Sequence, residues 1–111
     1  MTYNAPVQEM LFLFDKVLMG ERVLAGKFKD IDKSAISDIL KEVAKVSENI
    51  LVPINRDADI NPPTFSGGNV KCNEKYKEAY SALSTGGWIG ISGDQKYGGM
   101  GLPSVLTTCI N

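Results

Sequence analysis

Apolar residues near the start of the chain recur at the three- and four-residue spacing of an α-helix. Pro6 suits the first turn of such a helix, where its missing N–H costs nothing. The spacing predicts a helix over residues 6–19 that ends at Gly20 or in the stretch to Gly26. Its stripe is Val7, Met10, Leu11, Phe14, Val17 and Leu18, and Phe12 and Leu13 widen it, so more than one side should be covered.

The next helical stripe is the strongest periodic pattern in the chain. Asp32 or Ser34 supplies its cap, and charged residues of both signs occupy the opposite face. The pattern predicts a helix over residues 34–52. Pro53 lacks a backbone N–H and should kink or end this helix near Leu51, while a continuation beyond the kink stays open. The apolar positions are Ile36, Ile39, Leu40, Val43, Val46, Ile50 and Leu51.

Residues 58–72 contain turn formers without a period, which predicts an irregular surface loop. A third helix is predicted over residues 73–85, with Asn73 as its cap and Gly86 as a left-handed cap at its end. Its stripe should face the core, with the tyrosine hydroxyls at the rim, and consists of Tyr76, Ala79, Tyr80 and Leu83.

A glycine-rich connector follows over residues 86–101 and holds most of the chain's 11 glycines. Trp88 lies between glycines and is predicted to be a core anchor rather than a stacking platform. Helical spacing then resumes and predicts a last helix over residues 103–110, which reaches Asn111 without a stop signal and so reads as truncated. The pattern as a whole predicts an all-α fold, a small bundle of about four helices with this connector.

The composition excludes several classes of function. The 111 residues include no histidine, so there is no Ser-His or Cys-His nucleophile pair, and the spacing of Cys72 and Cys109 favours no metal site. A net charge of −1 with interleaved signs offers neither a nucleic-acid stripe nor a polybasic membrane patch. The apolar run over residues 10–14 is too short to span a membrane. Without a secretory signal at its start, the chain is predicted to be cytoplasmic.

Two glycines just before the last predicted helix resemble part of a phosphate-binding loop. They are Gly99 and Gly101, but Ser104 stands where the dinucleotide fingerprint needs a third glycine, and Pro103 removes an N–H from the first turn. The favoured interpretation is a sharp turn that needs positive φ.

The connector also resembles the signature of a known family. Residues 87–103 read GWIGISGDQKYGGMGLP, which is similar to the GGW, GLS and YGGQGLP elements of the acyl-CoA dehydrogenases. Upstream, VPINRD at 52–57 and YKEAY at 76–80 resemble the end of the family's second helix and its FKEAY helix. The start of the chain resembles a branch of large members similar to the methylthiopropionyl-CoA dehydrogenases. The match runs in order over essentially the whole chain, with departures at Gly93, Gln95 and Met100.

This resemblance implies the first domain of a larger enzyme. In the family, an N-terminal helical domain precedes a central β domain and a C-terminal helical domain, and FAD lies between the last two. A glutamate takes the α proton of an acyl-CoA while the β hydride passes to the flavin, and electrons leave to an electron-transfer flavoprotein. No position here matches the base or a flavin ligand, so residues 1–111 are expected to be an incomplete N-terminal domain, inactive alone and part of a homo-oligomer. The alternative is an independent helical interaction or oligomerisation module that reuses this domain.

By the same resemblance, the turn after the connector lies beside the acyl end of the substrate pocket. Three glycines would let the backbone pass close to a ligand, and Leu102 would offer an apolar wall. In the other interpretation the glycines only turn the chain, while Tyr97 and Leu102 pack in the core. The substrate-pocket candidates are Tyr97, Gly98, Gly99, Gly101 and Leu102.

The predicted helices also leave apolar residues that an isolated domain would expose. Phe12 and Leu13, together with Leu106 and Ile110 of the last helix, would normally face the missing domains. A patch of this kind should make the isolated domain self-associate.

Overall fold

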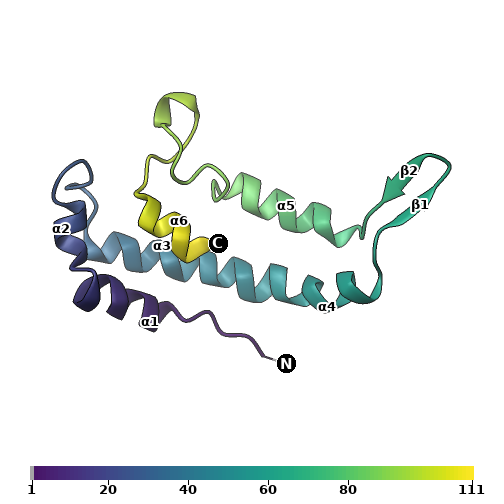
Figure 1. Cartoon of the computed structure of the whole chain (residues 1–111), viewed down its shortest axis with the longest axis horizontal. Coiled ribbons are helices and arrows are strands. Elements are labelled where there is room, and N and C mark those ends of the chain that lie inside the picture. Colours follow the sequence, from purple (N-terminus) through teal and green to yellow (C-terminus); the bar gives the residue numbers. More distant parts are fainter. Residues whose placement is uncertain (1) are drawn as a thin grey trace.

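Helices form most of the molecule, which is described for residues 2–111 in a computed structural model (Figure 1). They build a flattened body of 55 × 37 × 17 Å, with a small hairpin projecting at one end. The predicted helical fold class is therefore confirmed. The helical elements are α1 (Val7–Phe12), η1 (Leu13–Val17), α2 (Gly20–Leu24), α3 (Lys33–Val46), η2 (Ser47–Leu51), α4 (Val52–Ile60), α5 (Lys75–Thr85), η3 (Gln95–Tyr97) and α6 (Ser104–Ile110), and the strands are β1 (Thr64–Ser66) and β2 (Asn69–Lys71).

The first helix is followed by a short helix, α2, that the apolar pattern did not predict. α1 continues into the π-helical turn η1, where the Leu18 N–H donates to the Leu13 carbonyl at 2.9 Å. Met19 then adopts a left-handed conformation with φ of 50°, and α2 begins at Gly20. A Cβ at Gly20 would lie 2.1 Å from the ring of Phe14. This tight corner therefore depends on a residue without a side chain.

The second predicted helix continues past Pro53, which is the alternative that the sequence left open. Asp32 caps α3 by accepting the Ala35 N–H at 2.7 Å, and α3, η2 and α4 then follow one another without a break. In η2 the turn widens, so that the Val52 N–H donates to the Ser47 carbonyl five residues back. A proline has no N–H and its ring collides with the carbonyl of a regular helical turn, so a π-helical turn just before it relieves both problems.

The predicted irregular loop after this helix is wrong in part, because its centre is an antiparallel hairpin. β1 pairs with β2, and Phe65 lies opposite Val70. Gly67 and Gly68 join the strands with φ of 57° and 79°, which is the geometry of the two-residue type I′ turn. The strands are too short to show alternation in the sequence, but the Gly-Gly pair was a usable signal.

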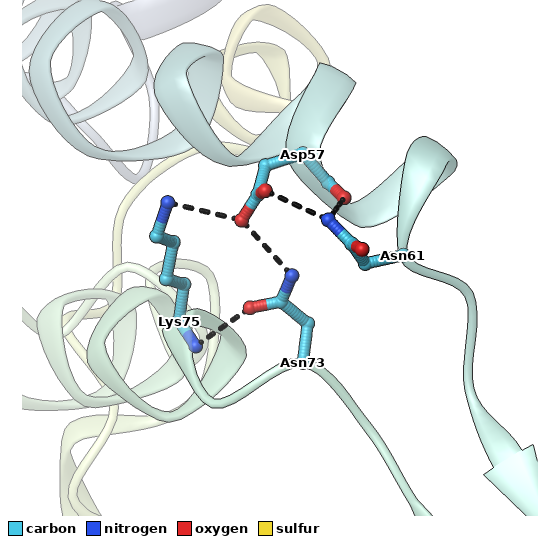
Figure 2. Close-up of polar contacts among 4 residues, drawn as sticks. All are labelled: Asp57, Asn61, Asn73 and Lys75. Carbon is cyan, nitrogen blue, oxygen red and sulfur yellow. Dashed lines mark hydrogen bonds and ion pairs between the residues drawn. The ribbon is translucent and has the colours of Figure 1, made fainter.

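A polar cluster ties the end of α4 to the start of α5 at the base of the hairpin (Figure 2). The Asp57 carboxylate accepts hydrogen bonds from the side-chain amides of Asn61 and Asn73, each at 3.0 Å, and pairs with the Lys75 ammonium at 2.9 Å. The Asn73 side-chain oxygen in turn accepts the Lys75 N–H at 3.1 Å, although the N-cap position of α5 is Glu74, one residue later than predicted. The cluster therefore fixes where the chain leaves one helix and enters the next.

Acid is expected to weaken this connection through Asp57. The hydrogen bond from Lys75, followed by that from Asn73, lowers the pKa of the Asp57 carboxyl below its ordinary value. Because the pKa is lower in the folded state, the contribution is present above the unfolded pKa and is lost as the pH falls through the folded one. The free energy of unfolding should therefore fall less between about pH 6 and pH 2 in Asp57→Asn than in the unmodified chain.

The matched control for this acid titration is Asp59→Asn, since Asp59 lies two residues away on the exposed side of α4. Since none of the hydrogen bonds and ion pairs found over residues 2–111 involves its side chain, this variant controls for the removal of one carboxylate at this end of α4. Identical titration curves for the two variants would contradict the role assigned to Asp57.

Two separate core clusters hold the helices together. Leu106 is only 1% exposed, so the last helix turns it into the larger cluster and not outward as predicted. Tyr76 and Tyr80 are also placed differently from the prediction, because α5 meets α4 through Ala79 and leaves both tyrosines exposed. The larger cluster comprises Phe14, Leu24, Ile36, Leu40 and Leu106, and the smaller one Ile54, Ala58 and Ala79.

Candidate functional site

The glycine-rich connector is a loop closed on itself by backbone hydrogen bonds. It leaves α5 through a left-handed residue, which is Gly87 with φ of 77° and not Gly86 as predicted. The Trp88 N–H donates to the Leu83 carbonyl at 3.0 Å and the Gly87 N–H to the Ser84 carbonyl at 3.1 Å. This pair of bonds is the Schellman arrangement, which satisfies the last carbonyls of a helix.

The two arms of the connector then bond to each other. The Met100 N–H donates to the Gly90 carbonyl at 3.0 Å, and the Leu102 N–H donates to the Ile91 carbonyl at the same distance. Ile91 is only 2% exposed, so it is the anchor of the loop, whereas the predicted anchor Trp88 is half-buried. These contacts fix the direction in which α6 departs.

A tight turn joins the arms at the tip of the loop. The Asp94 side chain accepts the Lys96 N–H at 2.8 Å, and its carbonyl accepts the N–H groups of Tyr97 at 2.9 Å and Gly99 at 3.1 Å. The turn ends at Gly98, whose φ of 86° favours glycine. One aspartate therefore organises the segment that contains the pocket candidates.

Gly99 is the most constrained position of the loop. A Cβ there would lie 2.1 Å from the Gly93 carbonyl oxygen and 2.6 Å from the Gly93 Cα, and both neighbours are backbone. The Gly101 N–H donates to the same carbonyl at 2.8 Å. The N–H groups of Gly99 and Gly101 are therefore used inside the loop, which argues against the phosphate-binding interpretation.

The five pocket candidates lie on one segment but turn toward different surroundings. Tyr97 is 81% exposed, so it does not pack in the core. Leu102 is half-buried and packs against the larger core cluster. The three glycines shape the backbone between them. The structure thus supports a turn-forming role for the glycines and a core contact for Leu102.

Two further observations bear on chemistry outside the loop, one on the Cys109 thiol and one on metal-binding side chains. Burial raises the pKa of the half-buried Cys109 thiol, which disfavours the reactive thiolate. Over residues 2–111 no three His, Cys, Asp or Glu side chains come together in a way that could hold a metal ion. Within the same range no helix is both long and apolar enough to cross a membrane.

Comparison with known proteins shows which enzymes the chain resembles. No protein-family model matches the chain. It is 28% identical over 98% of its length to the broad-specificity linear acyl-CoA dehydrogenase FadE5 of Mycobacterium tuberculosis. It is 29% identical over 96% of its length to the 3-methylmercaptopropionyl-CoA dehydrogenase of Ruegeria pomeroyi. The resemblance to acyl-CoA dehydrogenases is thereby confirmed, although the chain spans only 18% of the length of these two relatives.

Proposed function

We propose that this chain supplies the N-terminal helical domain of an FAD-dependent acyl-CoA dehydrogenase that works in the cytoplasm. The observation that supports this is colinearity: nearly the whole chain aligns with two such enzymes, over a small part of each. The complete enzyme would oxidise an acyl-CoA thioester to the trans-2-enoyl-CoA and pass electrons to an electron-transfer flavoprotein. The chain alone would be inactive.

We infer that the glycine-rich connector of this chain does not hold the flavin. The N–H groups at Gly99 and Gly101, which could have bound a phosphate, donate to Asp94 and Gly93 instead. The flavin and the catalytic base would therefore belong to the other domains of such an enzyme. The part left to this chain is to pack against those domains and to hold the segment from Tyr97 to Leu102 beside the acyl chain.

A chimera tests this division of labour. The corresponding segment of the M. tuberculosis relative is replaced by this chain, and flavin content and acyl-CoA-dependent dye reduction are measured. We expect a yellow, active chimera, while the isolated chain retains no flavin after desalting. The reference is the M. tuberculosis relative from which the corresponding segment has been deleted. Adding this chain to that truncated enzyme as a separate polypeptide should raise its activity. A flavin-loaded chimera without activity, or an isolated chain that holds flavin, would overturn the proposal.

Within the active chimera, Leu102→Ala tests the acyl-pocket role. If this side chain lines the pocket, the ratio of kcat/KM for long and short acyl-CoA substrates should change by about tenfold, because small apolar differences in a pocket give discrimination of this order. Leu11→Ala is the matched control, since Leu11 is also half-buried against the larger core cluster. Equal loss of stability in both variants with an unchanged ratio would mean that Leu102 serves only the core.

A further inference from the structure

The outer face of the first helix carries apolar and charged side chains that have no role in the core. The inner face of α1 and η1 packs in the larger cluster through Val7, Met10, Leu11 and Phe14. The opposite face is open, and Phe12 is 59% exposed and Leu13 50%. Residues three and four apart share a helix face, so one stripe contains Glu9, Phe12, Leu13 and Lys16.

This stripe is complementary to itself when the helix direction is reversed. Around a two-fold axis that passes between Phe12 and Leu13, Phe12 faces Leu13 of a second copy. On the same axis Glu9 faces Lys16 of that copy, and the second copy's Glu9 faces Lys16. A two-fold interface uses one surface patch twice, so each ion pair occurs twice and the apolar centre is doubled. The spacing of these four residues therefore favours an antiparallel pairing.

The two charges have no close ion-pair partner within residues 2–111. The ion pair of Lys16 found there is with Asp15, at 3.5 Å, and Lys33 lies closer to the same carboxylate, at 2.6 Å. The Lys16 side chain is 68% exposed. Among the ion pairs found across residues 2–111, none includes Glu9. An ion pair with a second copy would therefore not require Glu9 or Lys16 to give up a close partner.

The shape of the face also suits a second copy. Gln8, Glu9, Phe12 and Leu13 line a shallow, open depression on the helix surface. Further apolar side chains are exposed along the chain into α2, since Val17, Leu18, Met19 and Val23 are each at least half exposed. Exposed apolar side chains without a partner favour an interaction site.

We propose that two copies of this chain associate through α1 and η1, antiparallel about a two-fold axis between Phe12 and Leu13. A partner whose surface carries charges of one sign, such as an anionic membrane, would place a like charge opposite either Glu9 or Lys16. A second copy satisfies both charges at once. The inference concerns the 111-residue chain by itself, in which this face is open, and it is tested separately from the proposed enzyme function.

Charge reversal tests the pairing in the full 111-residue chain. Glu9→Lys and Lys16→Glu each place like charges opposite one another twice, and each should raise the dimer dissociation constant by roughly tenfold or more in sedimentation equilibrium. The two variants mixed in equal amounts should form a heterodimer, because each then meets its opposite. The double variant Glu9→Lys/Lys16→Glu should dimerise like the unmodified chain.

An apolar variant tests the centre of the interface. Phe12→Ala should abolish dimerisation without loss of helical circular dichroism, since this side chain is largely exposed. Phe65→Ala on the hairpin is the control, because Phe65 is 74% exposed and lies outside the proposed face. A monomer at all concentrations, single reversals without effect, or no recovery on mixing would each overturn the inference. Equal weakening by Phe65→Ala would place the interface elsewhere.

Discussion

Gly99→Ala is expected to be among the most destabilising substitutions in the chain. The added Cβ would meet the carbonyl oxygen of Gly93 at 2.1 Å, and neither backbone can yield without losing the bond from Gly101 to that carbonyl. Overpacking and a lost hydrogen bond together should cost about 2–4 kcal/mol. For a domain of this size the loss corresponds to a decrease of roughly 10–20 °C in Tm, measurable by thermal circular dichroism.

Gly26→Ala is the matched control for this substitution. A Cβ at Gly26 meets nothing within 4 Å, and its backbone is not left-handed. The change in the free energy of unfolding should be within about 0.5 kcal/mol or slightly stabilising, because alanine restricts the unfolded chain. Equal effects of the two substitutions would mean that the arms of the connector do not approach each other as described.

Much of the helical fold could be predicted because its signals are local. The stripe of α3 has both an apolar face and a cap, and Asp32 does accept the Ala35 N–H. The order of motifs from the first helix to the YGG turn also sufficed to identify the related enzymes. Both kinds of signal lie within short stretches of sequence, where the spacing and type of the residues determine the local structure.

The errors arose where contacts distant in sequence, or subtle backbone changes, decide the structure. The end of the first helix depends on the ring of Phe14 lying on Gly20, which no spacing rule contains. The helix through Pro53 depends on a π-helical turn, and such turns leave no clear pattern. Likewise, two adjacent glycines end α5, and propensity alone does not say that Gly87 adopts the left-handed conformation.

The connector shows the same division between what could be predicted and what could not. Positive φ was expected for Gly99 and Gly101. Gly101 has it, whereas Gly99 does not, and the other left-handed glycine of this turn is Gly98. The pairing of residues 90–93 with residues 99–102 was not visible, because it joins two segments that lack alternation. The position of Tyr97 outside the core follows from this closure, since the turn at Asp94 places its side chain on the surface.

Leu106→Ala is the second substitution expected to have a large effect, and it tests whether α6 is docked as described. Leu106 is 1% exposed among Ile36, Leu40 and Phe14. Removing a fully buried leucine side chain costs about 2–5 kcal/mol, through lost transfer energy and the cavity left behind. We expect the midpoint of urea unfolding to fall accordingly, with an unchanged m value.

Thr107 on the same helix provides a control, because its substitution is expected to change the stability of the fold in the opposite direction. Its side-chain oxygen is buried and has no hydrogen-bond partner within the described part of the chain. Thr107→Val keeps the shape and removes an unsatisfied polar group, so it should stabilise the fold by about 1 kcal/mol. If α6 were detached in solution, both side chains would be hydrated and both substitutions would change the midpoint little. Opposite shifts of the midpoint would therefore establish that the last helix is docked, and two negligible shifts would contradict it.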